Sequence, residues 1–361
     1  MGLAHRVAYR ALRPLLFSLD AERAHDLTLS WLAGDSRLVR GLVALPRVDD
    51  PVEIAGVVFP NRVGLAAGLD KEGRCLPALA AMGFGFIEIG SVAPQGEAWS
   101  DPPRIHRLTK ARALINRIGL HRGGLEPLCA ELTRHRWPLD PRSATPVRLG
   151  VNLACNVATR ASHAIQDYAL GLRATITWAD YFTINVSNPN ASNLHVPDTR
   201  PSLDHWLTAI DQVRIELADL TGKQPPLFLK ISPDLSSLAV QTLCEALRAR
   251  SDRVHPEGLY WGVIAANTSA RRDAVRDHPH ADGRGGLSGA PLREPVDQLV
   301  EQMRKQLGRH IAIIGTGGIL SGDDARARIA TGADLVQLYT GLIYRGPDLV
   351  REAAQALYSI R

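Results

Sequence analysis

Amide side chains gather in one short stretch of the chain, residues 181–195, which reads Y-F-T-I-N-V-S-N-P-N-A-S-N-L-H. Its first half is β-branched and aromatic like a buried strand, and its second half turns abruptly to Asn, Ser and Pro. Asn185, Asn188 and Asn190 can each donate and accept hydrogen bonds, which suits a small ligand with imide or carboxylate edges. Such a strand and loop are typical of substrate sites in barrel enzymes, although Asn-rich turns are also common in purely structural loops.

A lysine, Lys230, lies inside another apolar run, L-F-L-K-I-S at residues 227–232. A buried ammonium is costly unless something anionic faces it. Reduced flavin carries negative charge at its N1 and C2-carbonyl edge, and a lysine there raises its oxidising power. Pyridoxal phosphate would also require a lysine, but the surrounding Asn and Ser side chains fit the carbonyl and N–H groups of a flavin better. The structural alternative is a salt bridge between Lys230 and a neighbouring carboxylate.

Glycine-rich turns follow the last two apolar runs of the chain, at G-T-G-G-I (315–319) and Y-T-G (339–341). Each leads into a helical pattern, and bare N–H groups at the amino end of a helix bind phosphate. Other runs end in small or polar residues, at A-G-L-D-K (67–71), A-N-T-S (266–269) and, further on, G-G-L-S-G (285–289). We therefore expect a flat ligand with a phosphate tail at these ends.

The elements that must position these residues alternate between strand and helix. Helical patterns occur at 73–82, 161–174, 203–220, 238–250, 295–307 and 323–330. Between them are eight apolar runs, mostly continuous in Val, Ile and Leu, as in strands buried on both faces of a parallel sheet: 62–68, 85–91, 147–154, 181–187, 227–232, 258–268, 311–317 and 335–340. Eight such units predict an α/β fold, a closed (β/α)8 TIM barrel, with its chemistry in the loops after the strands. An open doubly wound sheet is the alternative, but no G-x-G-x-x-G follows the first strand.

Residues 1–45 differ from the barrel region, 46–361, because they show two short amphipathic helical patterns with basic and aromatic residues. Such helices can lie in a membrane interface, or they can pack as a cap on a soluble domain. No apolar run is long enough to span a bilayer, and we expect no signal peptide.

The composition limits the classes of function. With 361 residues, 45% hydrophobic residues and a net charge of +5, the chain is an ordinary soluble protein without a Lys/Arg block, so we expect no nucleic-acid partner. An anionic membrane surface explains the mild basic excess at least as well. The four cysteines include no C-x-x-C pair, which argues against structural zinc, an iron–sulfur cluster and disulfides, and we expect no metal.

Together the motifs resemble the membrane-associated, quinone-dependent (class 2) dihydroorotate dehydrogenases over nearly the whole chain. Further matching segments are G-F-G-F-I-E-I-G (83–90), P-R-I-H-R-L (103–108), I-N-R-I-G (115–119) and L-K-I-S-P-D-L (229–235). The segment L-D-A-E-R-A-H (19–25) resembles helices that dock on the membrane and form a tunnel for quinone. The resemblance implies FMN as cofactor, quinone as electron acceptor and a peripheral position on the cytoplasmic face of the cell membrane, and it leaves the oligomeric state open.

The resemblance also assigns residues. On the quinone side it implies His25, Arg104 and Tyr339. The implied substrate contacts are Lys71, Asn116, Arg117, Ile118, Gly119, Leu120, Asn185, Asn190, Asn267 and Thr268. The implied FMN contacts are Ala67, Gly68, Lys71, Ser91, Asn152, Asn185, Lys230, Ala266, Gly289, Gly318, Tyr339 and Thr340.

One set of catalytic positions departs from the family pattern. The serine that serves as base is replaced by Asn188, whose carboxamide cannot accept a proton from carbon. The threonine that relays the proton is replaced by Ala191, the neighbouring phenylalanine by Leu120, and a lysine in the third-strand turn by Cys155. Loss of positioned base catalysis slows a reaction by roughly 10²–10⁴-fold. His121 and His195 are candidate replacement bases, although each also reads as an ordinary solvated loop histidine.

Three functions are therefore compatible with the sequence. The preferred hypothesis is an FMN-dependent relative of dihydroorotate dehydrogenase with an altered substrate or base. The second is a genuine dihydroorotate dehydrogenase of pyrimidine biosynthesis with a tolerated base change. The third is a non-catalytic protein that binds flavin or a related ligand.

Overall fold

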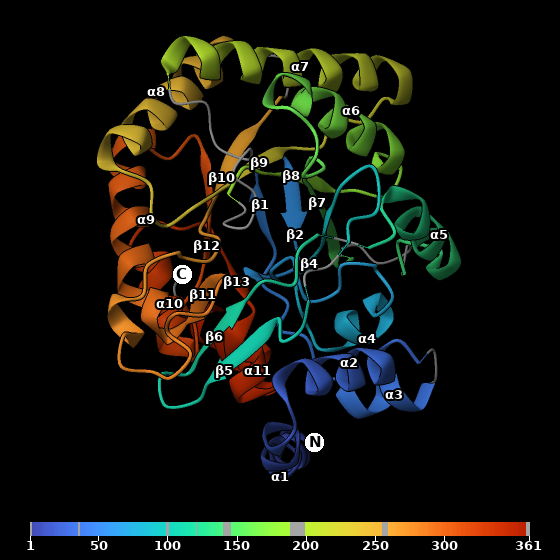
Figure 1. The fold of residues 1–361 in the computed structure, drawn as a ribbon. Helices are drawn as coiled ribbons and strands as arrows, with labels where there is room; N and C mark the ends of the chain where they lie inside the picture. Colours follow the sequence, from blue (N-terminus) through green and yellow to red (C-terminus); the bar gives the residue numbers. More distant parts are fainter. Residues whose placement is uncertain are drawn as a thin grey trace.

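Eight parallel strands close into a barrel at the centre of the molecule, and helices surround it (Figure 1). The computed structural model describes residues 2–34, 37–98, 101–120, 122–139, 146–187, 199–254 and 259–358. Around the barrel the strands follow the order β10-β12-β13-β3-β4-β7-β8-β9. They are β3 (Val63–Leu65), β4 (Phe86–Val92), β7 (Arg148–Leu153), β8 (Tyr181–Asn185), β9 (Leu227–Ile231), β10 (Trp261–Ala265), β12 (Ala312–Thr316) and β13 (Leu335–Leu338).

Each strand coincides with one of the eight predicted apolar runs, so the predicted (β/α)8 barrel is confirmed and the open doubly wound sheet is excluded. The strands are buried along nearly their whole length, which explains why their sequences are continuously apolar. The outer helices are α4 (Leu76–Ala81), α5 (Leu125–His135), α6 (Ala164–Thr175), α7 (Arg200–Thr221), α8 (Ser237–Val254), α9 (Arg293–Leu307), α10 (Gly322–Ala330), α11 (Thr340–Arg345) and α12 (Asp348–Tyr358).

Aromatic side chains fill the amino-terminal end of the barrel. Phe86, Tyr181 and Phe228 point inward from their strands and pack together, and Phe59 meets Phe86 edge-on with ring centroids 5.2 Å apart. Phe59 comes from a hairpin that the sequence analysis did not predict, β1 (Val52–Ile54) and β2 (Val57–Phe59). A Cβ at Gly150 would lie 2.1 Å from the Tyr181 ring, so glycine is required there. Among the described residues, this plug fills the amino-terminal end of the barrel interior.

A separate antiparallel sheet stands at the open end of the barrel. It consists of β5 (Ile105–Leu108), β6 (Ala113–Asn116) and β11 (Gly286–Gly289), in the order β11-β6-β5. Its register pairs Gly286 with Asn116 and Gly289 with Ala113. The sheet therefore brings two sequence motifs that are far apart in the chain to the same place beside the strand ends.

The amino-terminal region forms three helices, α1 (Gly2–Ser18), α2 (Ala21–Leu32) and α3 (Arg37–Val43). The first two are the predicted amphipathic helices, and the sequence analysis missed the third. The Asp20 carboxylate caps α2 by accepting hydrogen bonds from the Glu22 and Arg23 backbone N–H groups. Val39 and Val43 of α3 join the main hydrophobic core. The division of the chain at residue 45 stays a prediction.

The same three helices expose large apolar side chains, namely Leu12, Leu15, Leu27, Trp31, Leu38 and Leu42. In the part of the chain that the structure describes, none of the helices is both long and apolar enough to cross a bilayer.

Candidate active site

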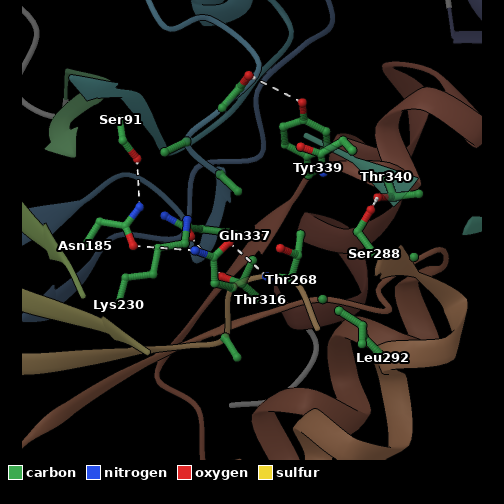
Figure 2. Close-up of a pocket in the computed structure, with 18 of the residues that line it drawn as sticks. Ser91, Asn185, Lys230, Thr268, Ser288, Leu292, Thr316, Gln337, Tyr339 and Thr340 are labelled. Atoms are coloured by element: carbon green, nitrogen blue, oxygen red, sulfur yellow. Dashed lines mark hydrogen bonds between the residues drawn. The ribbon is translucent and has the colours of Figure 1, made fainter. Parts of the chain in front are cut away.

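A polar cavity of about 1030 Å³, counted to its open mouth, lies at the carboxyl ends of the barrel strands (Figure 2). Its walls come from the ends of β3, β4, β8, β9, β10, β12 and β13 and from β6 and β11. The cavity is lined by residues from both ends of the barrel sequence and from the separate antiparallel sheet, so one ligand in it would contact all of these segments.

Most residues predicted for cofactor and substrate line this cavity. Of the predicted cofactor contacts, all except Asn152 do so, and of the predicted substrate contacts Arg117 does not. Arg117 instead donates a hydrogen bond to the Asp101 carbonyl. Asn190 and the three candidate base positions, Asn188, His121 and His195, lie outside the described residues. Their roles stay predictions.

A glycine turn after β12 forms one end of the cavity. Gly317 and Gly318 have φ values of +111° and +75°, and a Cβ on Gly318 would lie 2.3 Å from the Arg293 Cα. Thr340, the first residue of α11, donates a hydrogen bond to the Ser288 hydroxyl at 2.9 Å. This end is therefore a close-fitting backbone surface of the kind that grips phosphate.

Arg328 supports the same turn from behind, which the sequence analysis missed. Its side chain is fully buried and donates hydrogen bonds to the carbonyls of Gly317 at 3.0 Å and Arg293 at 3.1 Å. It also pairs with Asp297. The turn is therefore anchored to α9 and α10 and not only to its own strand.

The amide side chains at the mouth hold one another in place. Asn185 donates from Nδ2 to the Ser91 hydroxyl at 2.9 Å, as Figure 2 shows. Asn267 donates from Nδ2 to the Ser187 carbonyl at 3.0 Å, and the Ser187 backbone N–H donates to Asn185 Oδ1 at 3.2 Å. Because each amide is fixed by a neighbour, the group presents a pre-oriented set of donors and acceptors to a ligand.

Beneath the floor of the cavity lies a buried carboxylate that the sequence analysis did not single out. Glu88 of β4 is fully buried and accepts hydrogen bonds from Asn152 Nδ2 at 2.7 Å, Gln337 Nε2 at 2.6 Å and the Tyr181 hydroxyl at 3.1 Å. The Lys230 ammonium lies 3.7 Å from Glu88 Oε1. The salt bridge left open as an alternative for Lys230 is therefore present, at more than hydrogen-bond distance. Glu88 stands out in its run as the one charge among the apolar residues of F-I-E-I-G, and that is the signal that would have found it.

Lys71 reaches toward the substrate side of the cavity, where its ammonium donates a hydrogen bond to the Gly119 carbonyl. Burial, together with the nearby positive charge of Arg104, lowers the pKa of Lys71 to about 7. Its charge is therefore sensitive to pH near neutrality.

A second, largely apolar cavity of about 1900 Å³ lies between the amino-terminal helices and the barrel. Leu16, Phe17 and Leu27 are among its lining residues, together with His25. Burial lowers the pKa of His25, although the charge of Asp26 opposes the shift. The cavity shares three residues with the polar one: Asn116, Ile118 and Tyr339.

Two residues predicted for the quinone side occupy different places. Tyr339 stands in the wall common to both cavities, and its hydroxyl donates a long hydrogen bond of 3.4 Å to the Gly68 carbonyl. Burial raises the pKa of Tyr339 to about 12, so the phenol stays neutral. Arg104 lines neither cavity. It pairs with Glu22 of α2 and thereby ties the helices to the segment that precedes β5.

The dihydroorotate dehydrogenase family model matches residues 51–360 of the chain. The chain belongs to the dihydroorotate dehydrogenase family. It is 47% identical over 352 residues to the dihydroorotate dehydrogenase (quinone) of Methylibium petroleiphilum, which covers 97% of this chain and 98% of the relative. The corresponding protein of Delftia acidovorans is 44% identical over 356 residues, with coverages of 98% and 99%.

Solved structures agree with this assignment. The ligand-free DHODH from Eimeria tenella superposes with a TM-score of 0.81 at 35% identity and covers 94% of each chain. The same protein in complex with ferulenol gives a TM-score of 0.80 at 35% identity, with coverages of 93% and 90%. The resemblance inferred from the motifs is therefore confirmed at the level of the family, and the protein is an oxidoreductase of the dihydroorotate dehydrogenase type.

Several lining residues of this dihydroorotate dehydrogenase relative were absent from the sequence-based site. Thr316, Gln337, Ser288 and Leu292 all face the cavity. Thr316 and Gln337 follow the inward alternation of β12 and β13, which the continuous apolar character of those strands obscured. Among the described residues, no group of three or more His, Cys, Asp or Glu side chains is arranged to hold a metal ion.

Proposed function

We propose that the protein is an FMN-dependent dehydrogenase that takes a hydride from dihydroorotate, or a closely similar planar substrate, and passes the electrons to a quinone. The observation that carries this proposal is the shared wall at Tyr339, where a polar cavity with a phosphate-type glycine turn meets an apolar cavity under amphipathic helices. The names of the relatives support dihydroorotate itself better than an altered substrate. Pyrimidine biosynthesis is then the pathway served.

The chain's residues fit FMN on three counts. Gly317 and Gly318 both have positive φ, and a Cβ on Gly318 would collide with the Arg293 backbone, so this turn presents bare backbone to a phosphate. Among the described residues nothing lies within hydrogen-bond distance of the Lys230 ammonium, which is nearly buried and faces the cavity. Asn152 Oδ1 is buried without a hydrogen-bond partner in the described part of the chain. Bound FMN would supply the hydride acceptor and the relay of electrons to quinone.

The protein's contribution to the reaction is mainly orientation. Asn116, Asn185 and Asn267 converge on one side of the cavity and suit the imide and carboxylate edges of a pyrimidine ring. The protonated Lys71 ammonium provides a positive charge for the substrate carboxylate. Since Asn188 cannot accept the substrate proton, we expect that proton to leave slowly unless His121 or His195 replaces the base.

The apolar cavity suits a hydrophobic quinone that enters from a membrane. Leu12, Leu27, Trp31 and Leu42 are partly exposed while lining this cavity, and Leu15 and Leu38 are exposed outside it. These apolar side chains support a peripheral position of the helices on the cell membrane, at its cytoplasmic side. Inside, the lining is mainly aliphatic and aromatic, so we expect selection by size and not by hydrogen bonding.

Anaerobic mixing of the FMN-loaded protein with dihydroorotate tests the proposal. The flavin absorbance should bleach and then recover when a soluble quinone is added. Flavin that ignores dihydroorotate but is reduced by another planar substrate would overturn the substrate assignment and favour the altered reaction. Flavin that responds to no substrate and to no quinol would identify a non-catalytic flavin-binding protein.

A further inference from the structure

Glu88 lies in a polar layer inside the barrel, between the aromatic plug and the polar cavity. Its exposed fraction is 0%, and it belongs to a strand whose neighbouring residues are apolar. A buried carboxylate without compensation is strongly destabilising, so its surroundings must stabilise its charge. It does not line the cavity itself, and it reaches a ligand only through its neighbours.

The hydrogen bonds around Glu88 are arranged to stabilise a carboxylate. The Thr316 hydroxyl donates to Gln337 Oε1 at 2.8 Å, and this bond turns Gln337 Nε2 toward Glu88. Asn152 contributes a second amide donor. The pKa of Tyr181 is raised well above its usual value by burial and then by the charge of Glu88, so its hydroxyl remains a donor. Each of these three hydrogen-bond partners of Glu88 therefore donates to it.

Lys230 forms an ion pair with this carboxylate, but its ammonium does not donate a hydrogen bond to it. Its side chain is only 6% exposed, and the separation of 3.7 Å from Glu88 Oε1 exceeds hydrogen-bond distance. The ammonium donors therefore remain available to the cavity, while the negative charge beneath offsets the cost of burying the cation. The two charges together leave the floor of the cavity close to neutral.

We propose that Glu88 is a positioning residue that sets the redox balance of the cofactor through Lys230. This inference rests on the proposed binding of FMN. Lys230 alone would favour the anionic reduced flavin strongly, because the cation lies in a poorly screened interior. Glu88 offsets that preference and keeps reduced flavin a ready electron donor to quinone. Lys230 favours binding of FMN in its anionic reduced form, and the negative charge of Glu88 makes this preference for the reduced form smaller.

The test compares Glu88→Gln, Lys230→Met and their double variant with the unmodified protein, each loaded with FMN. Each is titrated anaerobically against a dye of known potential, with dithionite as reductant, so no natural substrate is needed. In Glu88→Gln the ratio of reduced to oxidised FMN at a fixed potential should rise about tenfold, which is about 30 mV for a two-electron couple. Lys230→Met should lower the ratio, and the double variant should return toward the unmodified protein.

Tyr181→Phe is the matched control, because it removes one hydrogen bond to Glu88 but leaves both charges in place. The ratio of reduced to oxidised FMN in Tyr181→Phe should differ less than about twofold from that in the unmodified protein. A purely structural role for Glu88 predicts similar ratios in Glu88→Gln and Tyr181→Phe, and that result would overturn the inference.

A second readout needs no flavin. Without FMN, Lys230→Met leaves Glu88 buried beside no cation, so its Tm should fall below that of the double variant. If Glu88→Gln fails to fold, Lys230→Met can still be compared with the double variant. Both the ratio of reduced to oxidised FMN and the Tm then test whether Glu88 and Lys230 act together. Equal FMN ratios and equal Tm values in Lys230→Met and the double variant would overturn the inference and leave the proposed function intact. Failure of the unmodified protein to bind FMN would instead overturn both.

Discussion

The polar cavity and the apolar cavity share a wall at Asn116, Ile118 and Tyr339, but they are formed by different structural elements and different kinds of side chain. The polar cavity is formed by the ends of barrel strands and by glycine turns whose backbone leaves no space for a side chain. The amides of Asn185 and Asn267 are each held by a hydrogen bond to a neighbouring residue. The apolar cavity lies against helices α1 to α3, and large aliphatic and aromatic side chains dominate its lining.

The difference fits the proposed function, in which one chain serves two unlike ligands. Hydrogen bonds are directional, so a site built from them must sit on elements that hold donors and acceptors to within a fraction of an ångström. Apolar packing is not directional, so short helices that dock on the barrel are sufficient for a hydrophobic ligand. Flavin reduction by the substrate and flavin reoxidation by quinone should consequently respond to different mutations.

The largest expected effect concerns flavin reduction by the substrate. Restoring the family pattern with Asn188→Ser and Ala191→Thr should speed flavin reduction by dihydroorotate by roughly 10²–10⁴-fold, because a positioned base is regained. Stopped-flow absorbance measures this step separately from flavin reoxidation by quinone, which should not change. Asn188→Ala with Ala191→Thr is the control. No acceleration relative to that control would show that the base hypothesis is wrong.

The next largest effect lies in the apolar cavity. Ala21→Trp places a bulky ring in it, and overpacking of about 1–3 kcal/mol corresponds to roughly 5–150-fold weaker quinone binding. Reoxidation by quinone should slow while flavin reduction by substrate is retained. Ala11→Trp, on the exposed face of α1, introduces the same ring outside the cavity and should have little effect. Equal slowing in both variants would show that quinone does not use this cavity.

A smaller effect follows from the titration of Lys71. Because its pKa is lowered to about 7, the ammonium loses its proton just above neutral pH, and the affinity for a carboxylate substrate should fall by up to about tenfold from pH 7 to 8. The folding stability of the protein without ligand depends on pH in the opposite direction to the substrate affinity. The unfolded chain binds more protons between about pH 7 and the ordinary lysine pKa of 10.5, so stability rises with pH over that window. Lys71→Arg should remove the binding effect in an orotate titration, and an unchanged pH profile would contradict this assignment.

The smallest effect concerns the join between the two regions. Arg104 and Glu22 form a mostly buried ion pair, with side chains 15% and 13% exposed. Its coupling should be about 1–2 kcal/mol, between the values for exposed and fully buried pairs. A double-mutant cycle with Glu22→Gln and Arg104→Gln, followed by urea unfolding, measures it. Additive effects of the two single changes would mean that the pair does not hold α2 to the barrel.

Much of the polar cavity was predictable because its residues follow buried strands directly. A continuous apolar run ending in Gly, Asn or Lys indicates both the strand and the edge at which its last side chain emerges. Lys230, Asn267 and Gly318 were placed in this way, and all three line the cavity. Glu88 was missed because one charge in an apolar strand gives no sign of the partners that stabilise it, and those partners come from three other strands.

The short antiparallel strands were not predictable in the same way. β6 pairs with β11 across about half the length of the chain, and neither strand is longer than four residues. Hairpin β1–β2 has three residues in each strand, too few to establish an alternating pattern. The polar cavity depends on the first of these pairings, since β6 supplies Asn116 and β11 supplies Gly289.

The sequence by itself determined the eight-stranded barrel, the glycine turns and the membership of the dihydroorotate dehydrogenase family, because runs of apolar residues and their end signals are local along the chain. Only the tertiary structure decided that Glu88 faces Lys230, that Arg328 supports Gly317 and that two cavities meet at Tyr339. Those contacts join residues far apart in sequence, and they exist only once the barrel has closed and the helices have packed against it.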